Sequence, residues 1–225
     1  MKKFNIALDG PSGAGKSSVA DRLAVHYDMK HLDTGAMYRA ISWLLDQSGI
    51  GPENESGVEA VLKDIDLKMP EGQEVWINGN DVTELIRTPQ VSMLASRYAS
   101  LPAVRRKMVS LQQQIASEKG YIVDGRDICD VVLPDAEVKI YLDASPEARA
   151  RRRYLQDQQA GKDVVYEQVL ADIEKRDLQD RNRDVSPLRI SEQAVLVDSS
   201  DLNLDQTVSE ICRIADQMLE KEGLL

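Results

Sequence analysis

Short apolar runs along this chain alternate with longer stretches of helical spacing. Phe4–Leu8 has the pattern of a short buried strand, and the stretch 18–27 places Val19, Leu23 and Tyr27 on one helical stripe. Further apolar runs lie at 121–123, 138–142 and 194–197, and helical patterns cover about 144–160, 164–183 and 204–220. This alternation predicts the α/β class, with a largely parallel sheet that carries helices on both faces.

One segment, from about residue 50 to residue 89, interrupts the alternation. It is rich in Gly, Pro, Asn and acidic residues, and it contains two strand-like runs, at 67–69 and 75–77. The pair Asn78-Gly79 directly follows the second run and is a typical hairpin signal. The segment therefore predicts a small β-containing insertion.

Composition and charge limit the function classes. The chain has 225 residues, 42% of them hydrophobic, which is enough for one α/β core. The two cysteines, Cys129 and Cys212, show no metal-ligand spacing and predict no disulfide framework. No signal-peptide pattern or apolar stretch of transmembrane length is visible, so a cytoplasmic protein is expected. A net charge of −10 argues against binding to nucleic acid or anionic membranes.

A complete G-x-x-x-x-G-K-S phosphate-binding loop lies between the first strand and the first helix. Glycines allow successive backbone N–H groups to face phosphate oxygens, and the following helix adds its positive dipole end. Lys16 can reach the outer phosphates of a nucleotide, and the Ser17 hydroxyl can bind Mg²⁺. The expected ATP-binding residues are Gly10, Pro11, Ser12, Gly13, Ala14, Gly15, Lys16, Ser17 and Ser18.

Two other interpretations of this loop fit its residues less well. A Gly-rich turn before a lysine can be an ordinary strand-to-helix connection, although here every specified position is filled and both flanks fit. A dinucleotide-binding fingerprint fits less well, because Ser18 stands where that pattern requires a third glycine.

Positive charge is concentrated in two of the predicted helices. Arg149, Arg151, Arg152 and Arg153 lie in one, and Lys175, Arg176, Arg181 and Arg183 lie in the next. Beside a phosphate loop, such clusters suggest a clamp on anionic substrates. A solvated helix face is the competing interpretation.

Two strand ends carry further candidates. Thr34 is a possible N-cap of a helix that contains Arg39 one turn later, although a capped helix start alone would explain this pattern. The run Val123–Asp127 ends a strand in two carboxylates that flank Arg126. Carboxyl ends of parallel strands line the ligand crevice, so these residues are expected to face the same cleft as the phosphate loop. A structural salt-bridged turn is the alternative.

Two helical stretches are ambiguous from their residues alone. Spacings of four and three place Arg176, Asp180 and Arg183 on one helical face, as surface ion pairing would also do. Ser96 and Arg105 have the pattern of ordinary helix-surface residues.

Taken together, these motifs resemble bacterial cytidylate kinase over nearly the whole chain. The resemblance depends on residues 7–17, on Leu32–Arg39 and Asp81–Thr88, and on Asp124–Asp127. It also depends on Leu133–Ala136, Lys139–Ala144, Arg176-Asp177 and Asp180–Arg183. It implies one P-loop kinase domain over 1–225: a core (1–49, 90–148, 184–225), a monophosphate-binding insertion (about 50–89), a lid (about 149–162) and a substrate-binding helix (about 163–183).

The resemblance also implies the reaction and the residues that carry it. The reaction is phosphoryl transfer from ATP·Mg²⁺ to CMP or dCMP, by a monomer that acts on small molecules. The catalytic residues it implies are Lys16, Arg126, Arg149, Arg152 and Arg176, with Arg153 as a further ATP ligand. The CMP-binding residues are Thr34, Arg39, Ser96, Arg105, Arg126, Asp127, Asp180 and Arg183. Ser17 binds the metal directly, and Asp33 and Asp124 approach it through water.

One departure from the family pattern lies beside the expected acceptor site. After Asp124–Asp127 the family continues Ile-Gly-Thr-Val-Val, whereas this chain has Cys129 and Asp130 in place of Gly-Thr. A strand that continues through 131–133 would turn Asp130 away from the site, and otherwise Arg126 would have to neutralise it.

Two alternative functions are also compatible with the phosphate loop. One is a P-loop kinase for another small acceptor, such as UMP or shikimate. The other is a GTP-dependent switch protein, but no Asn is followed by Lys here, so the usual guanine motif is missing.

Overall fold

The structure is a computed structural model that describes residues 3–70, 74–183 and 185–224. The predicted core boundary at residue 184 and positions 71–73 of the predicted insertion lie outside these residues. The chain divides into two compact units, Met1–Met29 with Lys119–Leu225, and Lys30–Glu118. The predicted insertion at about 50–89 falls within the second unit, and the finer domain division stays a prediction.

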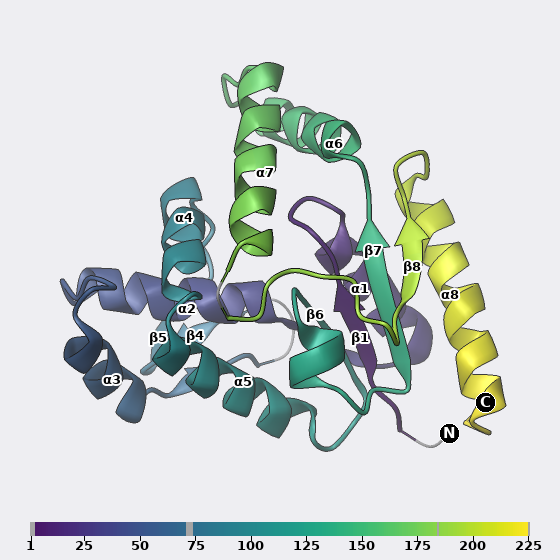
Figure 1. Cartoon of the computed structure of the whole chain (residues 1–225), viewed down its shortest axis with the longest axis horizontal. Coiled ribbons are helices and arrows are strands. Elements are labelled where there is room, and N and C mark those ends of the chain that lie inside the picture. Colours follow the sequence, from purple (N-terminus) through teal and green to yellow (C-terminus); the bar gives the residue numbers. More distant parts are fainter. Residues whose placement is uncertain (1–2, 71–73, 184, 225) are drawn as a thin grey trace. The chain divides into compact units, whose positions relative to one another are not determined.

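The first unit contains a parallel sheet in which four neighbouring strands follow the order β6-β1-β7-β8 (Figure 1). Their bounds are β1 (Ile6–Asp9), β6 (Tyr121–Gly125), β7 (Val138–Asp143) and β8 (Val195–Asp198). Ile6 pairs with Ile122 on one side and with Val138 on the other, so the carboxyl ends of these strands share one edge of the sheet. The phosphate loop follows β1 at that edge.

Helices α1 (Lys16–Tyr27) and α8 (Leu204–Lys221) pack on one face of this sheet. Leu23 and Ile211 are fully buried there against strand residues such as Leu8 and Ile140. The other face of β1 contacts a π-helical turn, η1 (Ile128–Val132), whose Cys129 Sγ lies 3.7 Å from the Ala7 carbonyl oxygen. The prediction that a strand continues through 131–133 is therefore wrong. The backbone of 128–132 forms a π-helical turn, in which N–H groups bond to carbonyls five residues earlier.

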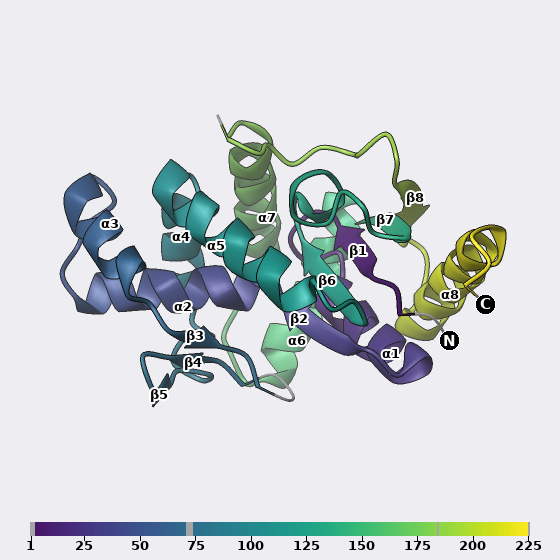
Figure 2. The ribbon, with the colours of Figure 1, turned by 90° about the horizontal axis from the view of Figure 1, so that it is seen from below.

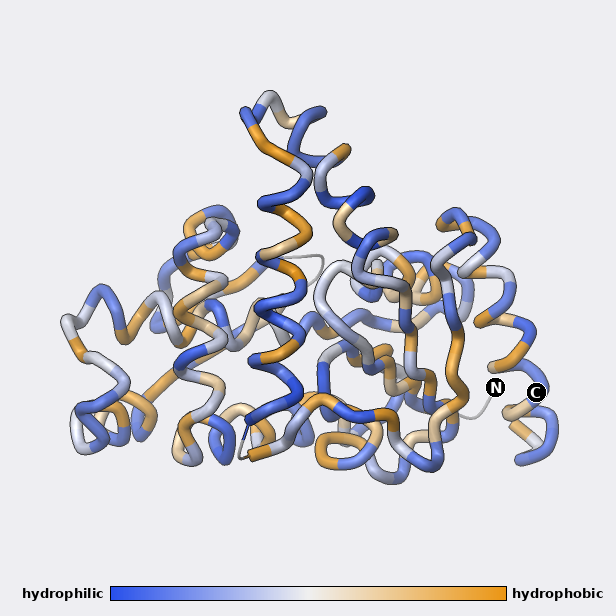
Figure 3. The backbone as a smooth tube through the Cα atoms, turned by 45° about the horizontal axis from the view of Figure 1, so that its top comes forward, coloured by the Kyte–Doolittle hydropathy of each residue, from blue (hydrophilic) through white to orange (hydrophobic). Residues whose placement is uncertain are grey.

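Two further helices of the first unit, α6 (Pro146–Gln159) and α7 (Tyr166–Arg181), pack against each other. Hydrophobic and hydrophilic residues alternate along α7, as Figure 3 shows, and the buried face carries two carboxylates, Asp177 and Asp180. Arg183 lies beyond the end of α7, so it is not part of one continuous helical face with Arg176 and Asp180.

The second unit begins with β2 (Lys30–Asp33) and is mainly helical (Figure 2). Its helices are α2 (Thr34–Gln47), α3 (Glu55–Lys63), α4 (Pro89–Tyr98) and α5 (Pro102–Ala116). A small antiparallel sheet consists of β3 (Leu67–Lys68), β4 (Trp76–Ile77) and β5 (Asn80–Asp81), and its last two strands flank Asn78-Gly79. The β-containing character of residues 50–89 is confirmed, although α3 was not predicted.

The parallel sheet with its phosphate loop and surrounding helices, together with the small antiparallel sheet, confirms the predicted α/β class. In the part of the chain that the structure describes, no helix has both the length and the apolar composition needed to cross a bilayer.

Candidate active site

The phosphate loop has the backbone that its sequence predicts. Gly10 has φ +149°, and a Cβ at this position would lie 2.0 Å from the Leu142 carbonyl oxygen of the neighbouring strand β7. Gly15 has φ +92° and directly precedes α1, where the left-handed conformation rather than lack of space requires glycine. The loop can therefore pass close to β7 and then turn into the helix that supplies the positive dipole end.

Lys16 is almost fully buried at the start of α1, and its Nζ donates a hydrogen bond to the Pro11 carbonyl oxygen at 2.8 Å. The pKa of Lys16 is lowered to about 7, mainly by burial and next by the nearby positive charge of Arg126. Asp124 and Asp9 act in the opposite direction and are too weak to restore the ordinary value. A nucleotide phosphate beside Lys16 would supply negative charge and so favour the charged form of this lysine.

Ser17, which directly follows Lys16, lies beside Asp124. The Ser17 hydroxyl donates to Asp124 Oδ2 at 3.1 Å, and Asp124 is buried near the carboxyl end of strand β6. Mg²⁺ in nucleotide sites is held by one or two protein oxygens together with phosphate oxygens and waters. A hydroxyl beside a carboxylate fits that requirement. Asp33, the other predicted carboxylate, belongs to the second unit.

Arg126 connects the turn after β6 to helix α7. Its Nε donates to Asp180 Oδ2 at 2.9 Å, and Arg183 forms an ion pair with the other carboxylate oxygen. Burial opposes ionisation of Asp180, but Arg126 and Arg183 together hold its pKa below the ordinary value. The structure therefore brings together three of the predicted acceptor-site residues, Arg126, Asp180 and Arg183, and the positive charge of Arg176 also acts on Asp180. Asp127 follows in the same turn, immediately before η1.

The arginines of α6 are already engaged with protein groups. Arg149 is buried, with hydrogen bonds to the Ser12 and Ala144 carbonyls and to Asp177. Arg152 donates to the Ala14 carbonyl at 3.4 Å and to the Ser199 carbonyl. Arg153 is half-exposed and pairs with Asp157. Two of these side chains thus bind the backbone of the phosphate loop, and the contact of these arginines with ATP stays a prediction.

In the second unit, Asp33 and Arg39 form an ion pair at the start of α2. Asp33 is the N-cap, since it accepts the Ala36 N–H at 2.9 Å, and its other oxygen accepts from Arg39 at 3.0 Å. The prediction that Thr34 caps this helix is wrong, because Thr34 is its buried first residue. Gly35 leaves room for the pair, since a Cβ there would lie 3.0 Å from Asp33 Oδ1 and 3.1 Å from an Arg39 nitrogen.

Arg105 on α5 is 5% exposed, so its interpretation as a helix-surface residue is wrong. Its guanidinium carbon lies 5.9 Å from the centre of the Tyr38 ring on α2, within cation–π range. Ser96 on α4 is partly buried and donates to the Ser92 carbonyl within its own helix. Tyr38 was missed as a site candidate; its position directly before Arg39 in the motif Leu32–Arg39 was the available signal.

Asp9 was also missed. It ends strand β1, directly before the phosphate loop, and its two oxygens accept the backbone N–H groups of Ile128 and Cys129 at 2.8 and 2.9 Å. Burial raises the pKa of Asp9 to about 6 even though these hydrogen bonds favour the ionised form. Asp9 therefore ties the strand of the phosphate loop to the turn that follows Arg126. A carboxylate at the end of an otherwise apolar strand was the signal in the sequence.

Asp130, the departure from the family pattern, is partly exposed. Its carboxylate lies 3.5 Å from the Arg189 guanidinium. Arg126 pairs with Asp180 and not with Asp130. This agrees with the expectation that Asp130 does not need Arg126 to neutralise its charge. The strand that was expected to turn Asp130 away from the site is absent from the described residues 131–133, and Asp130 lies instead in the π-helical turn η1.

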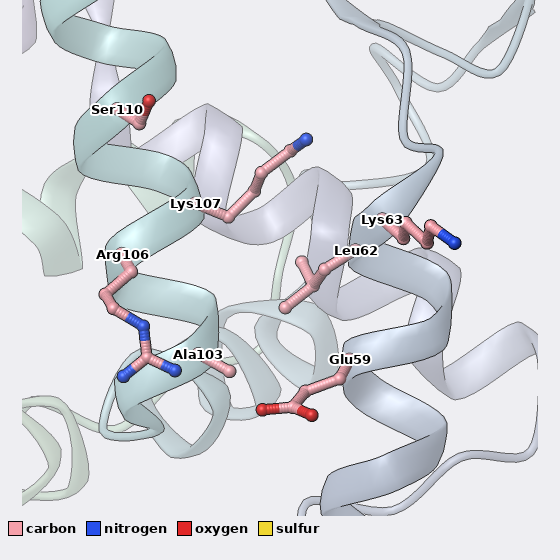
Figure 4. A pocket seen from close by; sticks show the side chains of 7 residues that line it. All are labelled: Glu59, Leu62, Lys63, Ala103, Arg106, Lys107 and Ser110. Atoms are coloured by element: carbon pink, nitrogen blue, oxygen red, sulfur yellow. The ribbon is translucent and has the colours of Figure 1, made fainter.

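A cavity of about 380 Å³ lies in the second unit between α3 and α5, and its lining residues include no predicted site residue (Figure 4). Arg106 and Lys107 extend toward it from α5, the helix that also carries Arg105. Its lining residues are Glu59, Leu62, Lys63, Ala103, Arg106, Lys107 and Ser110.

The parallel sheet, the phosphate loop with its buried lysine, and the arginines that contact the loop or Asp180 define the class of P-loop kinases. The family model "Cytidylate kinase" matches residues 6–217. The chain is 43% identical over 225 residues to a cytidylate kinase of Caldicellulosiruptor bescii, covering 99% of this chain and 100% of that protein. It is 46% identical over 214 residues to one of Carboxydothermus hydrogenoformans, covering 94% and 96% of the two chains. The chain belongs to the cytidylate kinase family.

Solved structures agree at the level of the fold. A shikimate kinase from Bacteroides thetaiotaomicron superposes with a TM-score of 0.51 at 11% identity, covering 96% of this chain and 99% of that one. At this low identity the similarity indicates a shared fold and gives no information about the phosphoryl acceptor.

Proposed function

We propose that this protein transfers the γ-phosphoryl group of ATP to CMP or dCMP, giving ADP and CDP or dCDP. The observation that carries the proposal is a buried phosphate-loop lysine in a chain whose family match runs over nearly its full length. The family membership favours a cytidine acceptor over UMP or shikimate, and it disfavours a GTP switch.

Phosphoryl transfer needs alignment and charge neutralisation more than it needs a base. The transition state spreads negative charge over the equatorial oxygens of the transferring group, with the attacking and leaving oxygens in line. Lys16, Arg126 and Arg176 are the positive groups that we assign to this charge. Arg126 is held ready by Asp180, so little reorganisation is required when the acceptor phosphate arrives. Mg²⁺, when held by Ser17 and Asp124, would neutralise charge on the donor phosphates.

For the acceptor, we assign Arg39 and Arg126 to the phosphate and Thr34, Ser96, Arg105 and Asp127 to the cytosine pocket. Asp180 and Arg183 are assigned to the sugar. Arg152 and Arg153 are assigned to the ATP phosphates once the lid, at about 149–162, closes over them. Exclusion of water on closure would prevent hydrolysis of ATP in competition with transfer.

The test is acceptor-dependent ADP production with CMP, dCMP, UMP and shikimate, followed by the Lys16→Ala variant with CMP. We expect turnover with CMP and dCMP and the loss of nearly all turnover in the variant, because Lys16 serves transition-state charge more than packing. Circular dichroism of the variant controls for folding. Equal rates with and without CMP would contradict the function, and a folded variant with near-normal turnover would contradict the role of Lys16.

We further propose that the protein acts as a monomer in the cytoplasm and binds no nucleic acid. Its net charge of −10 supports the last point, since nucleic acid would be repelled at long range. Sedimentation at several concentrations tests the monomer.

A further inference from the structure

Arg149 on α6 and Asp177 on α7 form a buried, two-pronged ion pair in the first unit. Arg149 Nη1 lies 3.0 Å from Asp177 Oδ1, and Nη2 lies 2.5 Å from Oδ2. The two side chains are 1% and 7% exposed. Bidentate pairing of a guanidinium with a carboxylate fixes orientation as well as distance, so Asp177 determines how the Arg149 guanidinium lies.

The remaining donors of Arg149 point at backbone carbonyls. Nε donates to the Ala144 carbonyl at 2.8 Å, and Nη1 also donates to the carbonyl of Ser12 in the phosphate loop at 2.9 Å. Four hydrogen bonds therefore engage four of the five N–H groups of this guanidinium. With its donors engaged in this way, Arg149 fixes the position of the phosphate loop through the Ser12 carbonyl.

The hydrogen bond to Ser12 has a geometric consequence for phosphate binding. In a planar trans peptide the C=O and the following N–H point in opposite directions. When Arg149 holds the Ser12 carbonyl on one side, the Gly13 N–H must face the other. Arg152 holds the Ala14 carbonyl and acts in the same way on the Gly15 N–H. Inward N–H groups are what a phosphate loop uses to bind its ligand.

Asp177 also lies one helical turn before Asp180, which pairs with Arg126 at 2.9 Å. Helix α7 is thus anchored at one carboxylate to the phosphate loop and at the next to the arginine assigned to the acceptor phosphate. Buried ion pairs contribute little net stability, because desolvation offsets their attraction. A geometric role explains this pair better than a stabilising one.

We propose that Asp177 is a positioning residue for the donor nucleotide: through Arg149 it orients the Ser12–Gly13 peptide for phosphate binding and couples the loop to α7. The role of this site rests on the proposed kinase function, but its test does not require turnover.

The experiment measures ADP affinity by calorimetry in the absence of acceptor, with Asp177→Asn, Arg149→Met and the double variant. We expect each single variant to weaken ADP binding at least about fivefold, which is about 1 kcal/mol. The double variant should be no weaker than Arg149→Met alone, because Asp177 acts through that arginine. A loss below fivefold in Asp177→Asn, or losses that add in the double variant, would overturn the proposal.

Two further variants separate positioning from folding. Asp177→Glu keeps the charge and changes the two-pronged geometry, so ADP affinity should fall while the melting temperature stays near that of the parent; unchanged affinity here would also overturn the proposal. Glu137→Gln is the matched control. It removes a carboxylate that pairs with Lys119 beside the amino end of β7, at the opposite edge of the parallel sheet from the phosphate loop. The ADP affinity of this control should be unchanged. If the parent protein binds ADP but shows no turnover with CMP, that result contradicts the proposed function and leaves the positioning role of Asp177 open to the same binding test.

Discussion

Lys16 should take up a proton when a nucleotide binds, and this can be measured directly. In the free protein burial lowers its pKa from 10.5 to about 7. A shift of this size corresponds to roughly 5 kcal/mol against the charged form. Phosphate oxygens in the loop would supply the counter-charge that the free site lacks. The pKa of Lys16 should therefore return toward its ordinary value in the complex.

The sign of the effect follows from which state binds more protons. At about pH 8.5 roughly 97% of free Lys16 is neutral, whereas Lys16 in the complex is charged, so binding takes up close to one proton. At about pH 6 Lys16 is mostly charged in the free protein as well as in the complex, so binding causes almost no proton uptake by Lys16. The ADP dissociation constant should consequently rise up to about tenfold per pH unit above pH 7. In the free protein the same shift makes stability rise with pH between about 7 and 10.5, where the unfolded chain binds the extra proton.

The assay is calorimetry of ADP binding at about pH 8.5 in two buffers of different ionisation enthalpy, which gives the number of protons exchanged. The control is Lys16→Gln, which cannot titrate and should show weaker binding without uptake. Equal heats in the two buffers for the parent protein would refute the reasoning, because Lys16 would then be equally charged in both states.

The remaining predictions concern the acceptor side and one helix cap. Arg105→Ala and Asp127→Ala should each raise the Michaelis constant for CMP more than that for ATP, because an unsatisfied buried polar group costs about 1–3 kcal/mol; equal changes for both substrates would remove these residues from the acceptor pocket. Cys129→Gly with Asp130→Thr should leave the CMP Michaelis constant within about threefold, and a tenfold improvement would show that the departure burdens the site. Asp33→Ala should lower stability by about 1–2 kcal/mol in denaturant unfolding through the lost cap and ion pair, whereas an unchanged midpoint would rule out the capping role.

The strands and long helices were predictable because their periodicity is strong. The phosphate loop was predictable too, since its chemistry is local: the glycines, Lys16 and Ser17 act within one turn of backbone. The short helix α3 was not predicted, because it buries only Val58 and Leu62. The turn η1 was missed because an apolar run such as 131–133 has the same composition in a strand and in a coiled segment.

The side chains that act across the chain were harder to predict. Arg105 and Arg106 are neighbours in α5, yet one is buried beside Tyr38 and the other is exposed, and only the packing of α5 decides which. The partner of Arg149 lies 28 residues away in the next helix, where Asp177 has the pattern of any surface carboxylate. Local sequence shows that such residues are charged but not which group each one meets.

The contact of Asp9 with η1 bears on how this site can change in evolution. Asp9 binds the main-chain N–H groups at positions 128 and 129, so the turn is held by atoms that every residue except proline possesses. Replacement of the usual glycine by Cys129 leaves both hydrogen bonds in place, and the thiol fits between the Ala7 and Ile140 carbonyls. The turn should therefore tolerate a change of side chain at position 129, whereas a loop held through its side chains would not, and such a change need not move the neighbouring Arg126.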